Sequence, residues 1–291
     1  MSGTTQTLRP RTVTLPGGLR LETVEQGDPG GPVVVLVHGW PDSWFSWSRV
    51  LAHLDPRLHV VAYSQRGFGG SDHPRAGYAV DRLAEDLVAL CEVLGIGRAH
   101  LVGHSHGSFV VRRAAEEHPG LVDRMVLVDS ADRVGGRLAA EVRAAIADLP
   151  DDVPEGFVRE FAASAVYRPV EPAFFDALVA EGRRAPGWVY RDAWEEMVAV
   201  DDRDRLGAVT APTLLVWGDR DALFDRGQQD RLLAALPDAR LRIHEGTGHC
   251  PNWECPRALA ADLDAFLLPG RRDTRAASPG GAGGSGRSGG R

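Results

Sequence analysis

The chain alternates short, strongly apolar segments with amphipathic helical segments along most of its length. The run "PVVVLV" at 32–37 is continuous and β-branched, which is typical of a strand that is buried on both faces. Similar runs recur at 58–64, 99–103, 124–130, 213–219 and 240–246, and helical patterns occupy 81–95, 108–118, 226–237 and 256–267. This alternation predicts an α/β fold with a mostly parallel central sheet that is flanked by helices on both faces.

The strand pattern stops between about residues 133 and 206. That segment contains helical patterns separated by prolines, so we expect a helical cap inserted between two strands of the sheet. The prediction divides the chain into a first core part at 1–132, the cap at 133–206 and a second core part at 207–269. The remaining segment, 270–291, is rich in Gly, Ser and Arg and is expected to be a disordered tail.

The pattern Gly103-His104-Ser105-His106-Gly107 lies between a predicted strand and a predicted helix. In that context G-x-S-x-G is typical of a nucleophile elbow, a sharp turn that exposes the serine hydroxyl. Glycine is needed on both sides because a side chain there would collide with the neighbouring strand or helix. Ser105 is therefore the predicted nucleophile. A metal pair of His104 and His106 is disfavoured because no nearby Asp, Glu or Cys completes a ligand set.

A serine nucleophile needs a base, and the base needs an orienting carboxylate. His249 lies in a Gly-Thr-Gly loop after the last strand and before the last helix, in the chain order Ser…Asp…His that suits this arrangement. Asp219 and Asp221 both follow the strand that begins at residue 213. Asp221 lies further into the loop, where it could reach His249, so we predict Asp221 as the acid and Asp219 as a loop-capping carboxylate.

An oxyanion hole requires two backbone donors near the serine hydroxyl. Gly39 follows an earlier buried strand and lets the chain turn tightly, so the N–H of Trp40 could face Ser105. The N–H of His106 supplies the second donor. His38 is expected to be structural.

Composition limits the partners of this chain. The formal net charge of -7 gives no support for a nucleic-acid partner. The three cysteines, Cys91, Cys250 and Cys255, are too few and too scattered for a disulfide framework or a zinc site. We see no signal peptide and no apolar run of about 18 residues that could span a membrane. The expectation is a cytoplasmic protein with a small-molecule substrate, without a metal or organic cofactor and with an undetermined oligomeric state.

Five segments together resemble the α/β-hydrolase fold superfamily. They are "HGWPDSWFSW", "SQRGFGGSDHP", "VGHSHGS", "WGDRD" and "GTGHCPNWECP", and they stand in the order of that family. The resemblance covers about Thr12 to Leu268. It implies a triad acid at the last Asp of a G-x-x-D segment, which is Asp221 here. It also implies a helical cap at the place where the strand pattern stops.

The first two of these segments are similar to the epoxide hydrolase and haloalkane dehalogenase branch of the superfamily. The resemblance implies an aspartate at the elbow, because that branch forms an alkyl-enzyme ester by displacement at carbon. This chain has Ser105 there, and a serine suits acyl transfer to a carbonyl. Tyr167 and Tyr190 are candidates for epoxide-activating tyrosines by location only.

Aromatic residues of the cap and of the loop after Trp40 predict an apolar pocket. The expected pocket residues are Trp44, Phe161, Phe174, Trp188, Tyr190 and Trp194. The sequence thus predicts a serine hydrolase that cleaves a medium-sized, mostly hydrophobic ester, thioester or lactone through an acyl-enzyme. Hydrolysis of a carbon–carbon bond by the same triad, a biosynthetic cyclase, or a ligand-binding protein that uses the same pocket stay open as alternatives.

Overall fold

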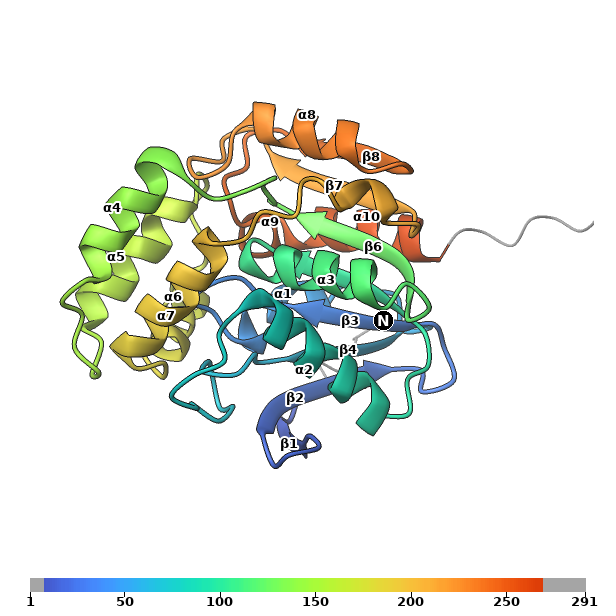
Figure 1. Cartoon of the computed structure of the whole chain (residues 1–291), viewed down its shortest axis with the longest axis horizontal. Helices are drawn as coiled ribbons and strands as arrows, with labels where there is room; N and C mark the ends of the chain where they lie inside the picture. The colour runs from blue at the N-terminus through green and yellow to red at the C-terminus, as the bar shows by residue number, and fades with distance from the viewer. Residues whose placement is uncertain (1–7, 269–291) are drawn as a thin grey trace, which may run out of the picture.

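The computed structural model describes residues 8–268, in which eight strands form one sheet (Figure 1). The strands are β1 (Arg11–Thr14), β2 (Arg20–Gly27), β3 (Val33–Val37), β4 (His59–Tyr63), β5 (Ala99–His104), β6 (Val122–Val128), β7 (Thr213–Gly218) and β8 (Ala239–His244). Their order across the sheet is β1-β2-β4-β3-β5-β6-β7-β8. The two pairs that involve β2 are antiparallel, and the pairs from β4 to β8 are parallel. The predicted mostly parallel sheet is confirmed.

The central strands are buried on both faces, which explains their continuous apolar sequences. In β3, Val34 and Leu36 belong to the apolar core on one face, whereas Val35 and Val37 belong to the core on the other. Successive side chains of a strand point to opposite faces, so a strand between two helical layers needs apolar residues at every position. One face is covered by α1 (Ser48–Leu51) and α10 (Pro256–Leu267), and the other by α2 (Val80–Val93), α3 (His106–Glu117) and α8 (Arg226–Ala235).

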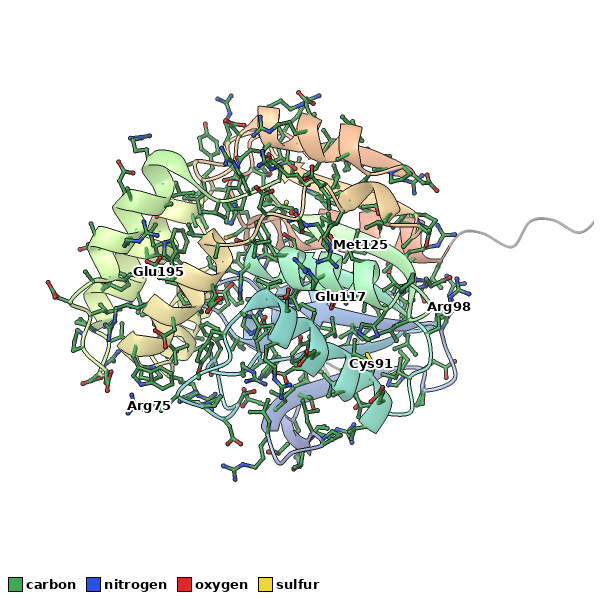
Figure 2. The ribbon with its side chains drawn as sticks, viewed as in Figure 1. Arg75, Cys91, Arg98, Glu117, Met125 and Glu195 are labelled. Atoms are coloured by element: carbon green, nitrogen blue, oxygen red, sulfur yellow. The ribbon has the colours of Figure 1, made fainter. Side chains whose placement is uncertain are left out.

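Apolar side chains lie mainly in this interior, and charged side chains lie mainly on the outside of the molecule. Cys91 of α2 and Met125 of β6 are buried, and Arg98 projects from the periphery (Figure 2). The three cysteines are free thiols; Cys91 and Cys250 pack in the interior, and Cys255 is partly exposed. Within the described part of the chain, every helix is too short or too polar to cross a bilayer.

Four α-helices and a short 3-10 helix (Leu206–Ala208) lie between β6 and β7, and Figure 1 shows the four α-helices together at one side of the molecule. They are α4 (Gly136–Ile146), α5 (Glu155–Ala165), α6 (Pro172–Gly182) and α7 (Gly187–Val198). Residues 129–212 are all described and contain no strand. Prolines lie at the start of three of these helices. Pro154 directly precedes α5, Pro186 directly precedes α7, and Pro172 is the first residue of α6. The tail expected at 270–291 lies outside the described residues.

Both ends of this inserted segment are held by one arginine of α3. The guanidinium of Arg112 is completely buried and pairs with the carboxylate of Asp202, which follows α7, at 3.0 Å. It also donates a hydrogen bond of 2.6 Å to the carbonyl of Ala131, which follows β6. The chain therefore leaves the sheet and returns toward it at neighbouring points.

Candidate active site

Ser105 occupies a strained turn between β5 and α3. Its φ angle is +49°, a region that costs free energy for a residue other than glycine. A Cβ on Gly103 would lie 2.4 Å from the carbonyl oxygen of Gly107, and a Cβ on Gly107 would lie 2.4 Å from the carbonyl oxygen of Val37. The turn thus requires both glycines of the G-x-S-x-G pattern, for the steric reason that the pattern indicates.

The loop after β3 lies directly against the serine. A Cβ on Gly39 would lie 3.2 Å from the Cβ of Ser105 and 2.8 Å from Nδ1 of His104. His106 begins α3, so its N–H has no acceptor inside the helix. Within residues 8–268, neither the N–H of His106 nor that of Trp40 donates a hydrogen bond. Both of these donors are free to bind an oxyanion.

A neutral histidine shapes the same loop. The Nδ1 atom of His38 is 2.7 Å from the carbonyl oxygen of Gly39, and its Nε2 accepts a 2.9 Å hydrogen bond from the N–H of Gln65. Burial lowers the pKa of His38 to about 4, which keeps the ring uncharged near neutral pH. These contacts place His38 in a supporting role behind the loop.

His249 and Asp221 are joined by a hydrogen bond. His249 lies between β8 and the short helix α9 (Pro251–Glu254), and its Nδ1 is 2.8 Å from Oδ2 of Asp221. The other carboxylate oxygen of Asp221 accepts the N–H groups of Leu223 at 2.8 Å and Phe224 at 3.1 Å. Three donors thus fix the carboxylate, and the pairing at Nδ1 leaves Nε2 as the proton-accepting atom of the ring.

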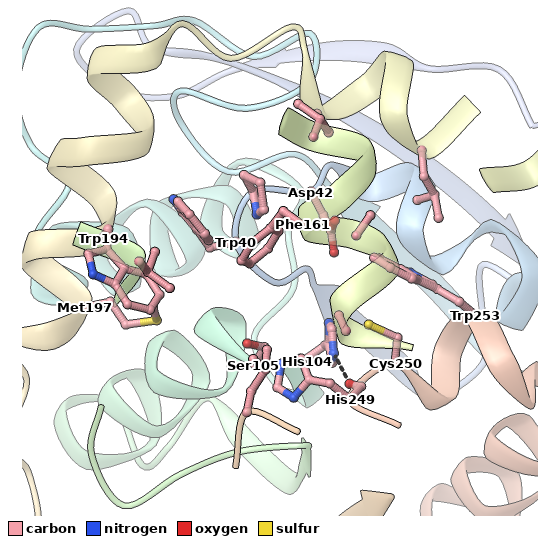
Figure 3. A pocket seen from close by; sticks show the side chains of 18 of the residues that line it. Trp40, Asp42, His104, Ser105, Phe161, Trp194, Met197, His249, Cys250 and Trp253 are labelled. Atoms are coloured by element: carbon pink, nitrogen blue, oxygen red, sulfur yellow. Dashed lines mark hydrogen bonds between the residues drawn. The ribbon is translucent and has the colours of Figure 1, made fainter. Parts of the chain in front are cut away.

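The two histidines beside Ser105 are buried and uncharged. His104 donates from Nε2 to the carbonyl oxygen of His249 at 2.9 Å, the contact that is dashed in Figure 3. Burial lowers the pKa of His104 and of His106 to about 3. The ring of His106 has no hydrogen-bond partner in the described part of the chain and does not line the cavity. His104 therefore supports the loop that carries His249.

Glu254 is a supporting residue that sequence reasoning missed. Its carboxylate accepts backbone N–H groups from Gly248 at 3.0 Å, from Tyr167 at 3.0 Å and from Arg168 at 2.7 Å. It therefore joins the loop of His249 to the connection between α5 and α6. Because all of these partners are backbone groups, the sequence contains no pattern that would have indicated them.

Ser105 and His249 line one cavity of about 40 Å³ (Figure 3). Room of that size holds only a few water molecules. Among the described residues no hydrogen bond joins the Ser105 hydroxyl to the His249 ring, and such contacts are often long without substrate. The rest of the wall is mainly apolar and includes Trp40, Leu138, Val142, Val158, Phe161, Leu178, Trp194, Met197, Leu223, Phe224 and Trp253.

Two of the six predicted pocket residues, Phe161 of α5 and Trp194 of α7, line this cavity. The other four lie elsewhere, and the prediction needs correction for each of them. They are Trp44, Phe174, Trp188 and Tyr190.

These aromatic rings pack in other places, and Trp44 belongs to the apolar core on the face of the sheet that α1 and α10 cover. Trp44 and Phe174 both contact the ring of Phe45, at centroid distances of 5.9 and 5.5 Å. Trp188 lies edge-on to Tyr78 at 5.8 Å. They fill space between elements, which is the ordinary use of aromatic residues in a helical segment.

The tyrosines also lie outside the cavity. The hydroxyl of Tyr190 donates to the carbonyl of Gly182 at 2.8 Å, inside the bundle of inserted helices. Tyr167 is 58% exposed, and the guanidinium of Arg220 lies over its ring. Neither tyrosine lines the cavity that contains Ser105.

The cavity wall also contains a carboxyl group that the sequence analysis did not single out. Asp42 follows the loop of Gly39 and Trp40 and lines the cavity (Figure 3). Burial raises the pKa of Asp42 to about 8, so this group is mostly uncharged at pH 7. The sequence feature that could have identified Asp42 as a cavity residue is its place in "HGWPD", three residues after Gly39.

One further cluster involves the residues of the site itself. Ligand-type atoms of Asp129, Asp221 and His249 lie within 4.8 Å of one another. Asp221 and His249 already bind each other through a proton, so the arrangement suits proton sharing.

Comparisons with known proteins agree with this architecture. The model of the family described as alpha/beta hydrolase fold matches residues 32–256. A non-heme chloroperoxidase of Streptomyces lividans is 29% identical over 88% of this chain and 99% of its own. Epoxide hydrolase A of Mycobacterium tuberculosis is 45% identical over 38% of this chain and 34% of its own.

A solved structure is similar over nearly the whole chain. The crystal structure of a putative aryl esterase from Burkholderia cenocepacia has a TM-score of 0.79 and 26% sequence identity, and the match covers 89% of this chain and 98% of the other. The family model alone spans most of the described residues, including Ser105 and His249. The chain therefore belongs to the alpha/beta hydrolase fold family and is a hydrolase.

Proposed function

We propose that the protein is a serine hydrolase that cleaves a mostly hydrophobic, small to medium-sized ester, thioester or lactone. The observation that carries the proposal is the placement of three groups. Ser105 lies on a strained turn, it shares a cavity with His249, and His249 is bonded to the buried carboxylate of Asp221. A serine with a base and an orienting acid is suited to acyl transfer.

In the proposed mechanism, His249 accepts the proton of Ser105 at Nε2 while Oγ attacks the substrate carbonyl. Asp221 orients the imidazole and stabilises its charged form. The N–H groups of Trp40 and His106 bind the oxyanion of the tetrahedral intermediate. The protonated His249 then gives its proton to the leaving alcohol or thiol. Water attacks the acyl-enzyme with His249 as base, and the acid is released.

The cavity supports a hydrophobic acyl group. Its wall is mainly apolar, and helices α4, α5 and α7 contribute much of it. We propose that the inserted helices α4–α7 act as a cap over Ser105 and limit the length of the acyl group. The small volume of about 40 Å³ favours short acyl chains as long as these helices keep their positions.

The identity of the nucleophile favours an ester over an epoxide. Relatives of this chain include proteins that are named epoxide hydrolases. A serine ether formed by epoxide opening would have no carbonyl for water to attack, whereas an acyl-enzyme has one. The two tyrosines considered for epoxide activation are also outside the cavity.

Labelling with a fluorophosphonate probe tests the proposal. We expect the wild-type protein to be labelled at Ser105 and to hydrolyse short p-nitrophenyl esters. The variant Ser105→Ala should show neither reaction, because it has no nucleophilic oxygen. Ser164→Ala is the matched control, since Ser164 lies on the inserted segment with its hydroxyl bonded to a backbone carbonyl. A folded wild-type protein that is neither labelled nor active on esters would refute the proposal.

A further inference from the structure

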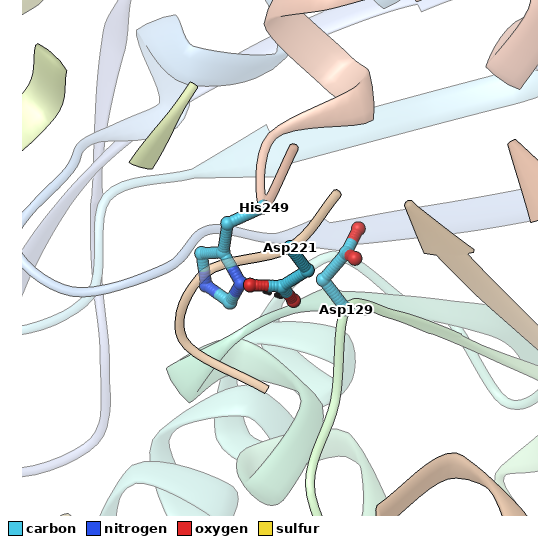
Figure 4. Close-up of side chains that lie close together, drawn as sticks. All are labelled: Asp129, Asp221 and His249. Atoms are coloured by element: carbon cyan, nitrogen blue, oxygen red, sulfur yellow. Dashed lines mark hydrogen bonds and ion pairs between the residues drawn. The ribbon is translucent and has the colours of Figure 1, made fainter. Parts of the chain in front are cut away.

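A second carboxyl group lies behind the predicted acid. Asp129 directly follows β6, has a φ angle of +43° and is completely buried. Its Oδ1 accepts the N–H of Gly218 at 2.9 Å. Its Oδ2 is also buried and has no hydrogen-bond partner within residues 8–268. Figure 4 shows this carboxyl beside Asp221, on the side away from His249.

The two carboxyl groups differ in the number of donors that face them. Asp221 accepts hydrogen bonds from two backbone N–H groups and from His249, whereas Asp129 accepts one from the backbone. Two adjacent carboxylates in a protein interior cannot both be charged at low cost. Asp221 has more hydrogen-bond donors and is the better place for the charge, which leaves the proton on Asp129.

The other groups near Asp129 do not change this assignment. Its titratable neighbours are the carboxylates of Asp221 and Glu254, the ring of His249 and the thiol of Cys250. No arginine pairs with it in the described part of the chain. Burial, followed by the charge of Asp221, raises the pKa of Asp129 well above its ordinary value.

We propose that Asp129 is a neutral carboxylic acid that donates its Oδ2 proton to Asp221 and thereby positions the acid of the triad. The donated hydrogen bond adds a fourth donor to the Asp221 carboxylate and fixes its side-chain angle relative to His249. Asp129 touches no substrate, so it is a positioning residue. The catalytic part of this proposal rests on the proposed serine hydrolase function.

Two substitutions separate this role from a purely structural one. Asn at position 129 can still accept from Gly218 and donate to Asp221, whereas Leu can do neither. For Asp129→Asn we expect kcat to stay within about 3-fold of wild type, with the same acid limb in the pH profile of kcat/KM. For Asp129→Leu we expect kcat to fall about 10- to 100-fold, as for the loss of one hydrogen bond to a charged group, with little change in KM.

The pH profile excludes the opposite assignment. If Asp129 were ionised, Asp129→Asn would remove a negative charge beside the imidazolium of His249. The acid limb, which reports the base of the free enzyme, would then move down by about one pH unit or more. That shift, or a loss of kcat in Asp129→Asn as large as in Asp129→Leu, would overturn the proposal.

An infrared measurement tests the protonation state without any turnover. A protonated carboxylic acid has a carbonyl stretching band that is separate from the carboxylate bands. The difference spectrum of wild type minus Asp129→Asn at neutral pH should contain this band, and the same band should persist in a Ser105→Ala background. Absence of the band refutes the protonated Asp129. Presence of the band in a protein that hydrolyses no ester would retain Asp129 as a proton donor and reject only the proposed function.

Discussion

Two aspartates that are two residues apart after β7 have different surroundings. Oδ1 of Asp219 accepts the N–H of Gly246 at 2.6 Å, which joins the loops after β7 and β8. Asp221 lies deeper, with a completely buried side chain that contacts His249. Two positions that are close in the sequence thus differ: Asp219 holds two loops together, whereas Asp221 contacts His249.

We expect Asp221→Asn to lower kcat/KM for a p-nitrophenyl ester by about 10²- to 10⁴-fold. An amide at this position favours the wrong tautomer of His249 and cannot stabilise the imidazolium. Asp219→Asn, the matched control, keeps an acceptor for Gly246 and should stay within about 5-fold of wild type, since a surface substitution of this kind has a small effect. Steady-state kinetics on both variants measure kcat/KM. A larger loss of kcat/KM in Asp219→Asn than in Asp221→Asn would identify Asp219 as the acid.

At the scale of elements, the inserted helices present defined faces to Ser105. On α5, Val158, Phe161, Ala162 and Ala165 line the cavity. Their spacing of three or four residues places them on one side of the helix. Phe157, on the same helix, contacts Tyr190 and lies outside the cavity. One helix therefore carries both cavity residues and packing residues.

Phe161→Ala should widen the cavity and shift the preference for acyl length. The ratio of kcat/KM for an octanoate ester to that for an acetate ester should rise by roughly 10-fold or more, on the scale of one or two methylene groups in an apolar pocket. Phe157→Ala removes an aromatic ring of the same size from the same helix and should leave the ratio unchanged. Equal ratios in wild type, Phe161→Ala and Phe157→Ala would show that α5 does not set the acyl length.

The same elements show what could be predicted from the sequence. The apolar runs predicted the sheet, because burial on both faces leaves a direct mark on the residues of β3, β5, β6 and β7. The rotation of α6 and α7 about their axes could not be predicted in this way. Aromatic residues were expected to face the pocket, but Phe174 and Trp188 face other elements. The aromatic content of a helix does not by itself show whether its rings line a pocket or pack against a neighbouring helix.

The roles of two acidic residues also could not be predicted from the sequence. Asp129 and Glu254 accept hydrogen bonds from Gly218 and Gly248, which are distant along the chain, and Asp129 also lies beside Asp221. Those partners become neighbours only when β6 pairs with β7 and α9 packs beside the loop of His249. A strand-end aspartate on its own carries no pattern that separates this role from an ordinary turn residue.

At the scale of the whole molecule, a buried ion pair joins the inserted segment to the core. The side chains of Arg112 and Asp202 are 0% and 1% exposed. Arg112 also lies over the ring of Phe109, with its guanidinium carbon 4.4 Å from the centroid. A buried pair of this kind contributes little net stability as a pair, but either partner alone is a large penalty.

We expect Asp202→Leu to lower the free energy of unfolding by about 3–5 kcal/mol, because it leaves the charge of Arg112 buried without a partner. Adding Arg112→Met should restore most of that loss, since the double variant contains no buried charge at this position. Urea unfolding of wild type, both single variants and the double variant measures the effect. If the double variant were as unstable as the sum of the two single variants, the penalty would come from lost packing instead.

Arg112 binds both ends of the inserted segment. This arrangement has a consequence for how proteins with this architecture can diverge in evolution. A segment that departs from and rejoins a scaffold at neighbouring points can be lengthened, shortened or exchanged without altering the scaffold. Ser105, Asp221 and His249 all stand on loops of the scaffold, and much of the cavity wall beside Ser105 stands on the insert. If the proposed function holds, reactivity and selectivity can be inherited separately, and we expect that grafting residues 133–201 from a relative onto this core would transfer that relative's substrate preference while leaving the reaction unchanged.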